Sequence, residues 1–472
     1  MAKAPKDTLQ LACIQIAVAL LLLTQAKSTT EDTSALRPND TVTSCIAGAR
    51  SALLAFRAGL SDPANLLPSW KGGDCCRWKG VYCSNRTGHV VRLDLRGPGY
   101  RSGNESRQVL AGNISSSLLG LQHLQYLDLS YNGFDKIQIP EFIGSLHQLR
   151  YLDLSWSPFI GRIPPQLGNL SNLQYLNLGY NLYGTYSMDI TWLSQLTSVE
   201  HLDMTGVNLS TIVHWLPVMN MLPTLKFLCL RACQLSDSPD SLQFSNLTSL
   251  ETLDISGNDF QKRCTPNWFW DLTSLKHLEI AQNGFYGPFP DDIEISTLLA
   301  LKSLNLSWNN FDGKIPENIG TLMQVESLDL SHNELSGEIP SSLSDLTSLS
   351  RLNLSYNSLG GKIPTGNQLQ TLEDQASIYV GNPGLCGPPL SRRCPQPKPI
   401  PEGNHGDASD DVVSFFLAMG SGYVMGLWVV FCTFLFKKRW RVSWYSLCDS
   451  LYDWVYVQVA VTWASLRGRI NG

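Results

Sequence analysis

The sequence predicts an α/β repeat solenoid, on three observations. The phrase L-x-x-L-x-L-x-x-N-x-(F/L)-x-G-x-I-P occurs three times in residues 301–364, at a spacing of 24 residues. Copies of its leucine core recur through most of the chain, and from Leu127 onward they are 24 to 26 residues apart. A unit of this size cannot bury its apolar face alone, so successive copies must stack.

A period of this size with this leucine pattern is the signature of leucine-rich repeats. We therefore expect a leucine-rich-repeat horseshoe of about eleven repeats with disulfide caps, followed by one transmembrane helix. The first two leucine cores, at Leu93 and Leu127, are 34 residues apart, which predicts a polar insertion at about 97–112. The repeats are centred on Leu93, Leu127, Leu152, Leu176, Leu202, Leu228, Leu253, Leu278, Leu304, Leu328 and Leu352.

Each part of the repeat has a physical role. Leucines that alternate with polar residues bury one face of a short parallel strand. The asparagine that follows can pair with backbone groups where the chain turns inward, and each unpaired group would cost roughly 1–3 kcal/mol. Ser157, Val207 and Cys233 replace it in three repeats, and the G-x-I-P segment supplies a tight turn.

The segments before the repeats predict export and a cap. Residues 1–26 have a basic start, an apolar run and a small-residue exit, which is typical of a secretory signal peptide. The alternative is an uncleaved anchor, but the run is shorter than the ~20 residues that span a bilayer. Residues 27–92 form an amino-terminal cap with a short amphipathic helix and two tryptophans.

Six cysteines lie in the predicted caps. Sequence alone does not fix their connectivity. Adjacent cysteines rarely pair with each other, so we expect Cys45–Cys75 and Cys76–Cys83. Cys386–Cys394 is the expected pair of the carboxyl-terminal cap, residues 365–394. In the repeats, Cys233 is expected to be a buried thiol, whereas Cys229 and Cys264 stay unassigned.

The carboxyl-terminal part predicts a membrane anchor. The repeats, residues 93–364, and their cap are followed by a proline-rich and then acidic linker, 395–411. Residues 412–436 hold no charge over 25 residues, which is long enough for a transmembrane helix. Basic residues follow at once, so the tail 437–472 is expected inside and the repeats outside, in a single-pass type I plasma-membrane protein.

Two further patterns belong to this topology. Small residues repeat every four positions in the predicted span, which favours close helix packing, although glycine is common in membrane helices generally. Asn-x-Ser/Thr sequons occur only before the span, which fits a glycosylated exterior. The small residues are Ser414, Ala418, Gly422 and Gly426. The sequons are at Asn39, Asn85, Asn104, Asn113, Asn169, Asn208, Asn246, Asn305 and Asn353.

Together, the cap motif DCCRWKGVYC, the L-x-G-x-I-P repeats, the end cap VGNPGLCGPPL and the short tail resemble a plant leucine-rich-repeat receptor-like protein. The similarity is strongest to the kinase-less, defence-associated group that includes receptors for fungal xylanase and leaf-mould or scab resistance proteins. This resemblance implies a cell-surface receptor for an extracellular protein or peptide ligand. It further implies signalling through adaptor and co-receptor leucine-rich-repeat kinases, one of them associated through the transmembrane helix.

Aromatic side chains gather in two columns of repeats two to four. One precedes the central leucine, and the other lies four residues after it. Aromatic residues often anchor interfaces, so we expect ligand binding there, although tyrosine is also an ordinary choice in these repeats. The late repeats carry Ser303, Ser327 and Arg351 in the first column, and the resemblance implies co-receptor contact there. The candidate ligand-binding residues are Tyr126, Tyr131, Tyr151, Trp156, Tyr175 and Tyr180.

The column after the central leucine is mostly acidic. Seven of its eleven residues, from Asp94 to Asn353, are Asp or Glu. They could favour a basic ligand. The alternative is that they are repeat consensus residues that bond along the sheet.

Nothing in the sequence predicts catalysis, a cofactor or a metal. His201 and His277 share a column three repeats apart, too far for one metal site, and no H-E-x-x-H, P-loop or kinase motif is present. A net charge of −5 argues against a nucleic-acid partner. The rival functions are a membrane-tethered recognition or inhibitor module, and a shortened decoy without its own ligand.

Overall fold

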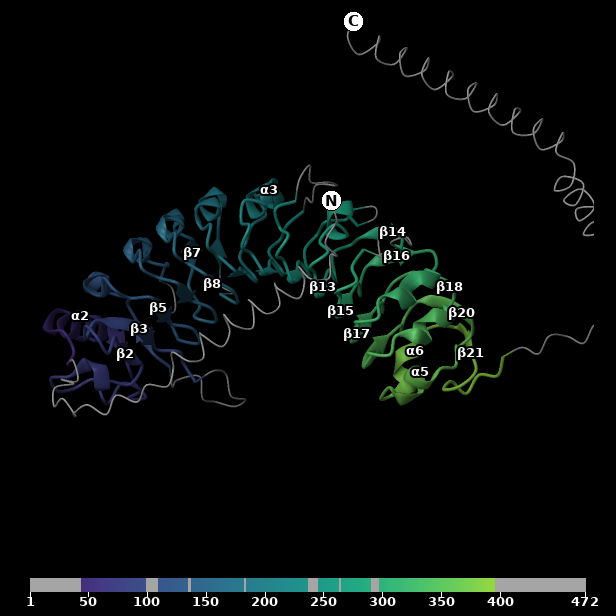
Figure 1. Cartoon of the computed structure of the whole chain (residues 1–472), viewed down its shortest axis with the longest axis horizontal. Helices are drawn as coiled ribbons and strands as arrows, with labels where there is room; N and C mark the ends of the chain where they lie inside the picture. The colour runs from purple at the N-terminus through teal and green to yellow at the C-terminus, as the bar shows by residue number, and fades with distance from the viewer. Residues whose placement is uncertain are drawn as a thin grey trace, which may run out of the picture. The chain divides into compact units, whose positions relative to one another are not determined.

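The computed structural model describes residues 44–98, 109–134, 137–181, 184–236, 245–262, 265–289 and 297–394, which form a curved stack of coils (Figure 1). The predicted solenoid is confirmed. A sheet of twelve strands in chain order lines the inner, concave side of the arc, and eleven of them lie at the predicted leucine cores. These eleven are β3 (Val90–Asp94), β5 (Tyr126–Asp128), β6 (Tyr151–Asp153), β8 (Tyr175–Asn177), β10 (His201–Asp203), β11 (Phe227–Cys229), β12 (Thr252–Asp254), β13 (His277–Glu279), β15 (Ser303–Asn305), β17 (Ser327–Asp329) and β19 (Arg351–Asn353).

The register is the same at every parallel pair of this sheet. Leu127 lies opposite Leu152, and Leu202 lies opposite Leu228. All four leucines are fully buried, so the solenoid core runs along the back of the sheet. Each position of the repeat therefore forms a straight column across the concave face, and the columns determine which side chains meet.

An asparagine ladder closes each coil behind the sheet. The Asn258 amide donates to the carbonyls of Leu230 and Ile255, at 2.9 and 2.6 Å, and its oxygen accepts from the backbone N–H groups of Cys233 and Leu235. The substituted repeats differ. The Ser157 hydroxyl donates to one carbonyl, that of Leu129, and Val207 offers no polar group.

Short helices and strands complete the coils away from the concave face (Figure 1). Most coils contain one turn of 3₁₀ helix before the next strand. These turns are η2 (Ser116–Gly120), η3 (Glu141–Ser145), η4 (Pro165–Asn169), η5 (Thr191–Gln195), η6 (Asn267–Phe269), η7 (Glu317–Thr321) and η8 (Ser341–Asp345), with α3 (Trp215–Met219) in the fifth coil. Short second strands pair beside the concave sheet, namely β7 (Gly161–Arg162), β9 (Thr185–Tyr186), β14 (Tyr286–Pro288), β16 (Asn310–Asp312), β18 (Ser336–Glu338), β20 (Ser358–Lys362) and β21 (Gly384–Cys386).

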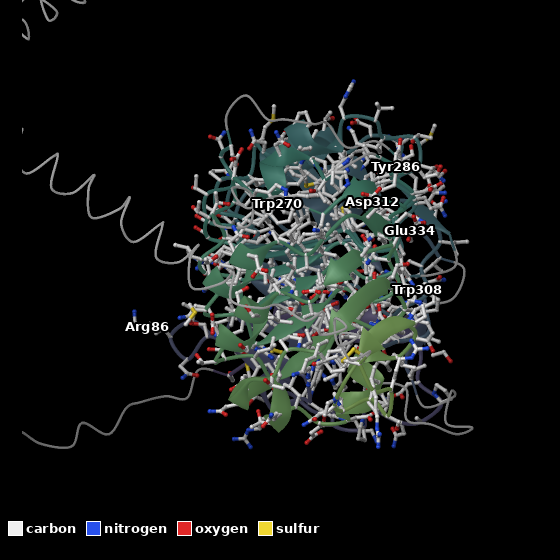
Figure 2. All side chains as sticks on the ribbon, turned by 90° about the vertical axis from the view of Figure 1, so that its right-hand side faces the viewer. Arg86, Trp270, Tyr286, Trp308, Asp312 and Glu334 are labelled. Atoms are coloured by element: carbon white, nitrogen blue, oxygen red, sulfur yellow. A yellow bond between two sulfur atoms is a disulfide. The ribbon has the colours of Figure 1, made fainter. Side chains whose placement is uncertain are left out.

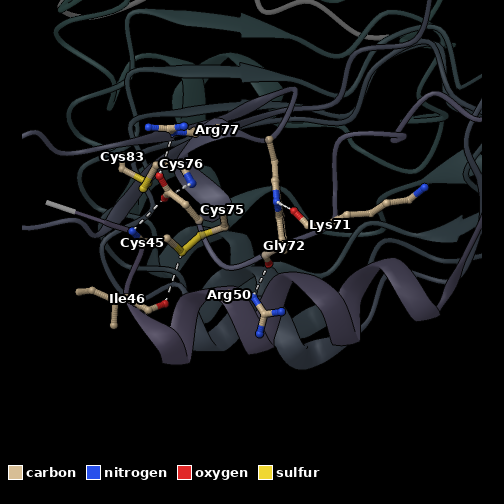
Figure 3. The surroundings of a disulfide bond; sticks show 11 residues. Cys45, Ile46, Arg50, Lys71, Gly72, Cys75, Cys76, Arg77 and Cys83 are labelled. Atoms are coloured by element: carbon tan, nitrogen blue, oxygen red, sulfur yellow. Dashed lines mark hydrogen bonds and ion pairs between the residues drawn. A yellow bond between two sulfur atoms is a disulfide. The ribbon is translucent and has the colours of Figure 1, made fainter. Parts of the chain in front are cut away.

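The amino-terminal cap covers the exposed end of the core. Its helix α2 (Ala47–Ala58) buries Leu53 and Phe56, and the 3₁₀ turn η1 (Cys75–Arg77) precedes β2 (Val81–Cys83), which pairs antiparallel with β3. The structure joins Cys45 to Cys75 and Cys76 to Cys83 (Figure 3). The indoles of Trp70 and Trp78 stack at 5.3 Å, and each donates its N–H to a cap carbonyl.

Part of the predicted insertion belongs to the coil. Leu110 is buried, and β4 (Ala111–Gly112) pairs with β1 (Leu60–Ser61) of the cap. The sequence L-A-G-N-I at 110–114 is a degenerate form of the L-x-G-x-I segment of the other repeats, which explains this placement. Residues 99–108 of the insertion lie outside the described part of the chain.

The carboxyl-terminal cap continues the ladder by one rung. It contains α5 (Asn367–Thr371), α6 (Gln375–Tyr379) and β21, and Cys386 is joined to Cys394. The Asn382 amide donates to the carbonyls of Leu354 and Tyr379, as a ladder asparagine does. The cap thus provides hydrogen-bond partners for the backbone of the last repeat after the repeat pattern has ended.

The predicted signal peptide, linker, transmembrane helix and tail all lie outside the described residues. Within the described ranges, no helix has both the length and the apolar character that crossing a bilayer requires.

Replacing a ladder asparagine should destabilise the solenoid far more than replacing a surface asparagine. Asn258→Ala leaves several buried backbone groups unpaired, so we expect the free energy of unfolding to fall by about 2 kcal/mol or more. Asn172→Ala is the control, because this exposed side chain makes one bond, to the His147 carbonyl. Urea denaturation followed by circular dichroism measures both. Equal effects of the two changes would contradict the role of the ladder.

Candidate functional site

The first aromatic column is a continuous stack on the concave face. We call it the inner column: Tyr126, Tyr151, Tyr175, His201 and Phe227, one from each of β5, β6, β8, β10 and β11. Successive ring centroids are 4.0 to 4.2 Å apart and the planes are within 11° of parallel. The strand spacing of roughly 4.8 Å and the constant register impose this contact.

The second aromatic column runs beside the first. We call it the outer column: Tyr131, Trp156 and Tyr180, whose centroids are 5.6 and 4.2 Å apart. All three backbones are left-handed, with φ between 52° and 58°, because the chain turns there just before the ladder position. The turn projects each ring out of the coil, and all three side chains are half-buried.

Two arginines end the columns at the amino-terminal side. The Arg92 guanidinium lies 3.9 Å from the centroid of the Tyr126 ring, and Arg96 lies 4.8 Å from that of Tyr131. Arg92 also pairs with Asp94 at 2.6 Å and contacts Tyr82 of β2. These cations cover the free faces of the terminal rings through cation–π contacts.

Between the columns, the first carboxylates are sealed rather than offered to a ligand. Asp128 and Asp153 are 2% and 4% exposed. Each accepts the backbone N–H and the hydroxyl of a serine two residues on, Ser130 and Ser155, at 2.6 to 2.9 Å. The predicted bonding along the sheet is wrong for this pair, because both bonds stay within one strand. Burial raises the pKa of Asp153.

The geometry decides what this surface can bind. Each ring inside a stack packs both of its faces against neighbouring rings. Only ring edges and hydroxyl groups can therefore contact a ligand. Burial raises the pKa of Tyr126 and of Tyr175, so both phenols stay protonated. The Tyr126 hydroxyl donates to Asp128 at 3.4 Å, and the Tyr175 hydroxyl accepts from the Asn177 amide at 3.5 Å. An edge of ring C–H groups with a row of phenols suits an extended polar chain such as a peptide.

The structure brings together all six aromatic residues that the sequence singled out, and adds to them. His201 and Phe227 extend the inner column by two repeats. A third stack, the distal column, consists of Trp308, His332 and Tyr356. Each of these three directly precedes a ladder asparagine, so the sequence did carry the signal.

The distal column changes the expected contrast between early and late repeats. The late repeats lack rings in the inner-column position but carry them in the outer-column position. Trp308 and Tyr356 are 55% and 51% exposed, and His332 lies between them at 3.7 and 4.4 Å. Figure 2 shows Trp308 and Tyr286 on the same side of the solenoid. A β-carbon on Gly381 (φ 81°) would lie 2.7 Å from the Tyr356 ring, so the cap closes this column tightly.

The unpaired cysteines are buried and unreactive in character. Cys229 and Cys233 form no disulfide, and burial raises the pKa of both thiols, that of Cys229 to about 12. The Cys233 thiol donates to the Met204 carbonyl in a ladder position, and Cys264 lies outside the described residues. One group of three metal-type ligands occurs among the described residues, at Cys45, Cys75 and Cys76, and disulfides already occupy it.

The sequons in the described part fall into two groups. Asn85, Asn113, Asn169 and Asn246 are exposed and lie away from the concave sheet, whereas Asn208 is half-buried. Asn305 and Asn353 are in the acidic column itself, where their oxygens accept from Ser307 and Ser355. The inner and outer columns carry no sequon.

Comparison with known families defines the class of the chain. A leucine-rich-repeat N-terminal domain matches residues 47–84, and leucine-rich repeats match 123–146, 148–170, 223–285 and 296–359. The chain therefore contains a leucine-rich-repeat N-terminal domain followed by leucine-rich repeats.

Within that class the chain is similar to plant receptor-like proteins. It is 37% identical over 278 residues to Receptor-like protein EIX1 of Solanum lycopersicum, covering 57% of this chain and 26% of the relative. Receptor-like protein EIX2 of the same plant is 37% identical over 286 residues, 59% of this chain and 27% of the relative. The chain thus matches about a quarter of the length of these relatives.

Solved structures share the fold. The Arabidopsis receptor kinase HAESA, in complex with the peptide hormone IDA and the co-receptor SERK1, aligns with a TM-score of 0.54 at 26% identity. That alignment covers 68% of this chain and 55% of HAESA. A plant ice-binding protein aligns with a TM-score of 0.54 at 23% identity, over 75% of this chain and all of that chain, which shows the fold alone.

The stacked His201 should make stability pH-dependent. Burial between Tyr175 and Phe227 lowers the pKa of His201 to about 4, below the ~6.5 of an unfolded chain. The unfolded state takes up the proton first, so this contribution to stability is lost as pH falls from about 6.5 towards 4. The difference in urea midpoint between the natural chain and His201→Phe should be larger at pH 4.5 than at pH 7. The exposed His147→Phe is the control, and a pH-independent difference would contradict the lowered pKa.

Proposed function

We propose that this chain is a cell-surface receptor-like protein that recognises an extracellular ligand, a defence elicitor, on the concave face of its early repeats. It signals through associated receptor kinases. The ligand is a protein or peptide, and the predicted membrane helix couples the repeats to its partners. The late repeats, with the distal column, are the docking end for a co-receptor.

The paired aromatic columns are the observation that carries this proposal. The inner and outer columns place eight half-buried rings on the concave side of five neighbouring repeats, and neither column contributes to the buried core. The core is already complete without them, since the leucines behind the sheet are fully buried. Aromatic residues that add nothing to a core but stay ordered on a surface are typical interface anchors.

The comparisons support a receptor role. The relatives with the highest similarity reported above are named receptor-like proteins, and HAESA was solved with a peptide hormone and a co-receptor. This chain spans about a quarter of the receptor-like relatives, so ligand, partners and signalling remain proposals for it.

Removing the centre of the two columns should abolish ligand capture. Tyr151→Ala, Trp156→Ala and Tyr175→Ala, combined in the full chain, remove rings but leave the leucine core intact. We expect at least a tenfold loss in capture of the extracellular ligand in pull-downs read by mass spectrometry. The matched control changes the exposed Tyr186 and Tyr286 to alanine, away from the concave face. Capture retained by the first variant would refute the assignment.

The predicted transmembrane stripe separates a receptor from a tethered binder. Ser414, Ala418, Gly422 and Gly426 lie outside the described residues, and their packing role is an expectation from sequence. Gly422→Leu with Gly426→Leu should reduce co-purification of partner kinases from plant membranes, because bulky residues keep helices apart. Ligand capture should be unchanged. If kinase association survives, the helix acts as a tether only, as an inhibitor module or decoy would require.

A further inference from the structure

Two histidines lie side by side at the joint between the amino-terminal cap and the first full coil. Each is three residues before the inner-column position of its repeat, Arg92 or Tyr126. The register pairs Arg92 with Tyr126, so His89 and His123 occupy the same column. Their ring centroids are 3.9 Å apart and the planes are tilted by 50°. His89 is half-buried and His123 is exposed.

The backbones on both sides are fixed. The Ser84 N–H donates to the His89 carbonyl at 2.8 Å, and the Gln125 N–H donates to the Val91 carbonyl at 2.8 Å. The two imidazoles are therefore held one strand spacing apart by the sheet itself. Only their side-chain torsions can change the distance between the ring nitrogens.

This column does something different in three of the later repeats. Asn172, Thr224 and Ser274 each use it to donate a hydrogen bond to a carbonyl of the preceding coil, at 2.7 to 2.9 Å. Neither imidazole makes such a bond to any residue in the described ranges. The histidine nitrogens are thus left available at a position that Asn172, Thr224 and Ser274 use for coil-to-coil bonding.

A cavity of about 110 Å³ adjoins the pair. It lies between the histidines and the start of α2, and Ile46, Gly48 and Gln122 are among its lining residues. The histidines are the only titratable groups in that lining. A cavity of this volume has room for an ion and water, since a water molecule takes up roughly 30 Å³ of liquid.

We propose that His89 and His123 form a two-histidine site for a divalent transition-metal ion of the zinc, copper and nickel class. Neutral imidazole is the nitrogen ligand that these ions prefer, with metal–nitrogen distances of about 2.0–2.1 Å for zinc. A modest rotation of the exposed His123 ring brings one nitrogen of each ring to that distance from a shared ion. Water and the Gln122 amide oxygen complete the coordination.

The site would clamp the cap to the repeats. The 34-residue step between the two histidines contains the polar insertion, so a bound ion closes the longest connection between successive coils. The first-turn amides of α2 carry a partial positive charge, which favours water or an anion as the outer ligand. The same amides could hold an anion beside protonated histidines, and this second occupant is distinguished by the test.

The test is a metal titration of the full chain, purified without a polyhistidine tag. We expect one Cu²⁺ bound with imidazole nitrogen signals in electron paramagnetic resonance, and competition by Zn²⁺ in calorimetry. His89→Ala and His123→Ala should each weaken binding at least tenfold, since each removes one of the two histidine ligands. The control is His147→Ala, an exposed histidine one repeat further on, which should bind as the natural chain does.

Thermal denaturation gives the second readout. Zn²⁺ should raise the melting temperature of the natural chain and of His147→Ala, but not that of His89→Ala or His123→Ala. Unchanged metal affinity in His89→Ala and His123→Ala would overturn the proposal. So would stabilisation of the natural chain by inorganic phosphate and not by zinc, which would assign the cavity to an anion.

Discussion

The rest of this molecule depends on one constraint: a ladder asparagine donates hydrogen bonds to the carbonyls of two successive coils. Asn258 shows it fully, with four bonds to buried backbone groups. Because such a rung stands at the same place in most coils, the strands cannot shift relative to one another without leaving polar groups buried and unpaired. Constant register is the consequence, and columns of side chains follow from it.

Columns explain why small sequence differences produce large surface features. A tyrosine at one inner-column position is an ordinary surface residue, but three in successive repeats become a stack with centroids about 4 Å apart. The same rule gives the distal column around His332 and the histidine pair at His89 and His123. A solenoid can thus acquire a site by repetition, without a loop or a cleft built for it.

Much of this could be predicted from the sequence, because period and burial are local properties. The eleven strands and the disulfide pairs lie where the pattern places them. The inner and outer columns were visible as well, since they need only a repeat alignment. The sequence did not show that Asp128 and Asp153 are sealed by serines of their own strands, because burial by neighbouring columns depends on side-chain packing.

Other features were missed for physical reasons that can be named. Asn382 works as a ladder rung although the repeat pattern has ended around it, so periodicity alone did not reveal it. The degenerate segment that holds Leu110 hid the end of the first coil. His89 and His123 are 34 residues apart, and only the register across the insertion brings them together.

The central claim is that ligand lies against the ring edges of the inner column. Site-specific photo-crosslinking tests it most directly, with a photoreactive phenylalanine in place of Tyr151 in the full chain and, as reference, in place of the exposed Leu299 outside the sheet. The account predicts a covalent adduct with an extracellular protein or peptide at position 151 and none at position 299. An adduct of equal yield at both positions, or an adduct at 299 alone, would contradict it.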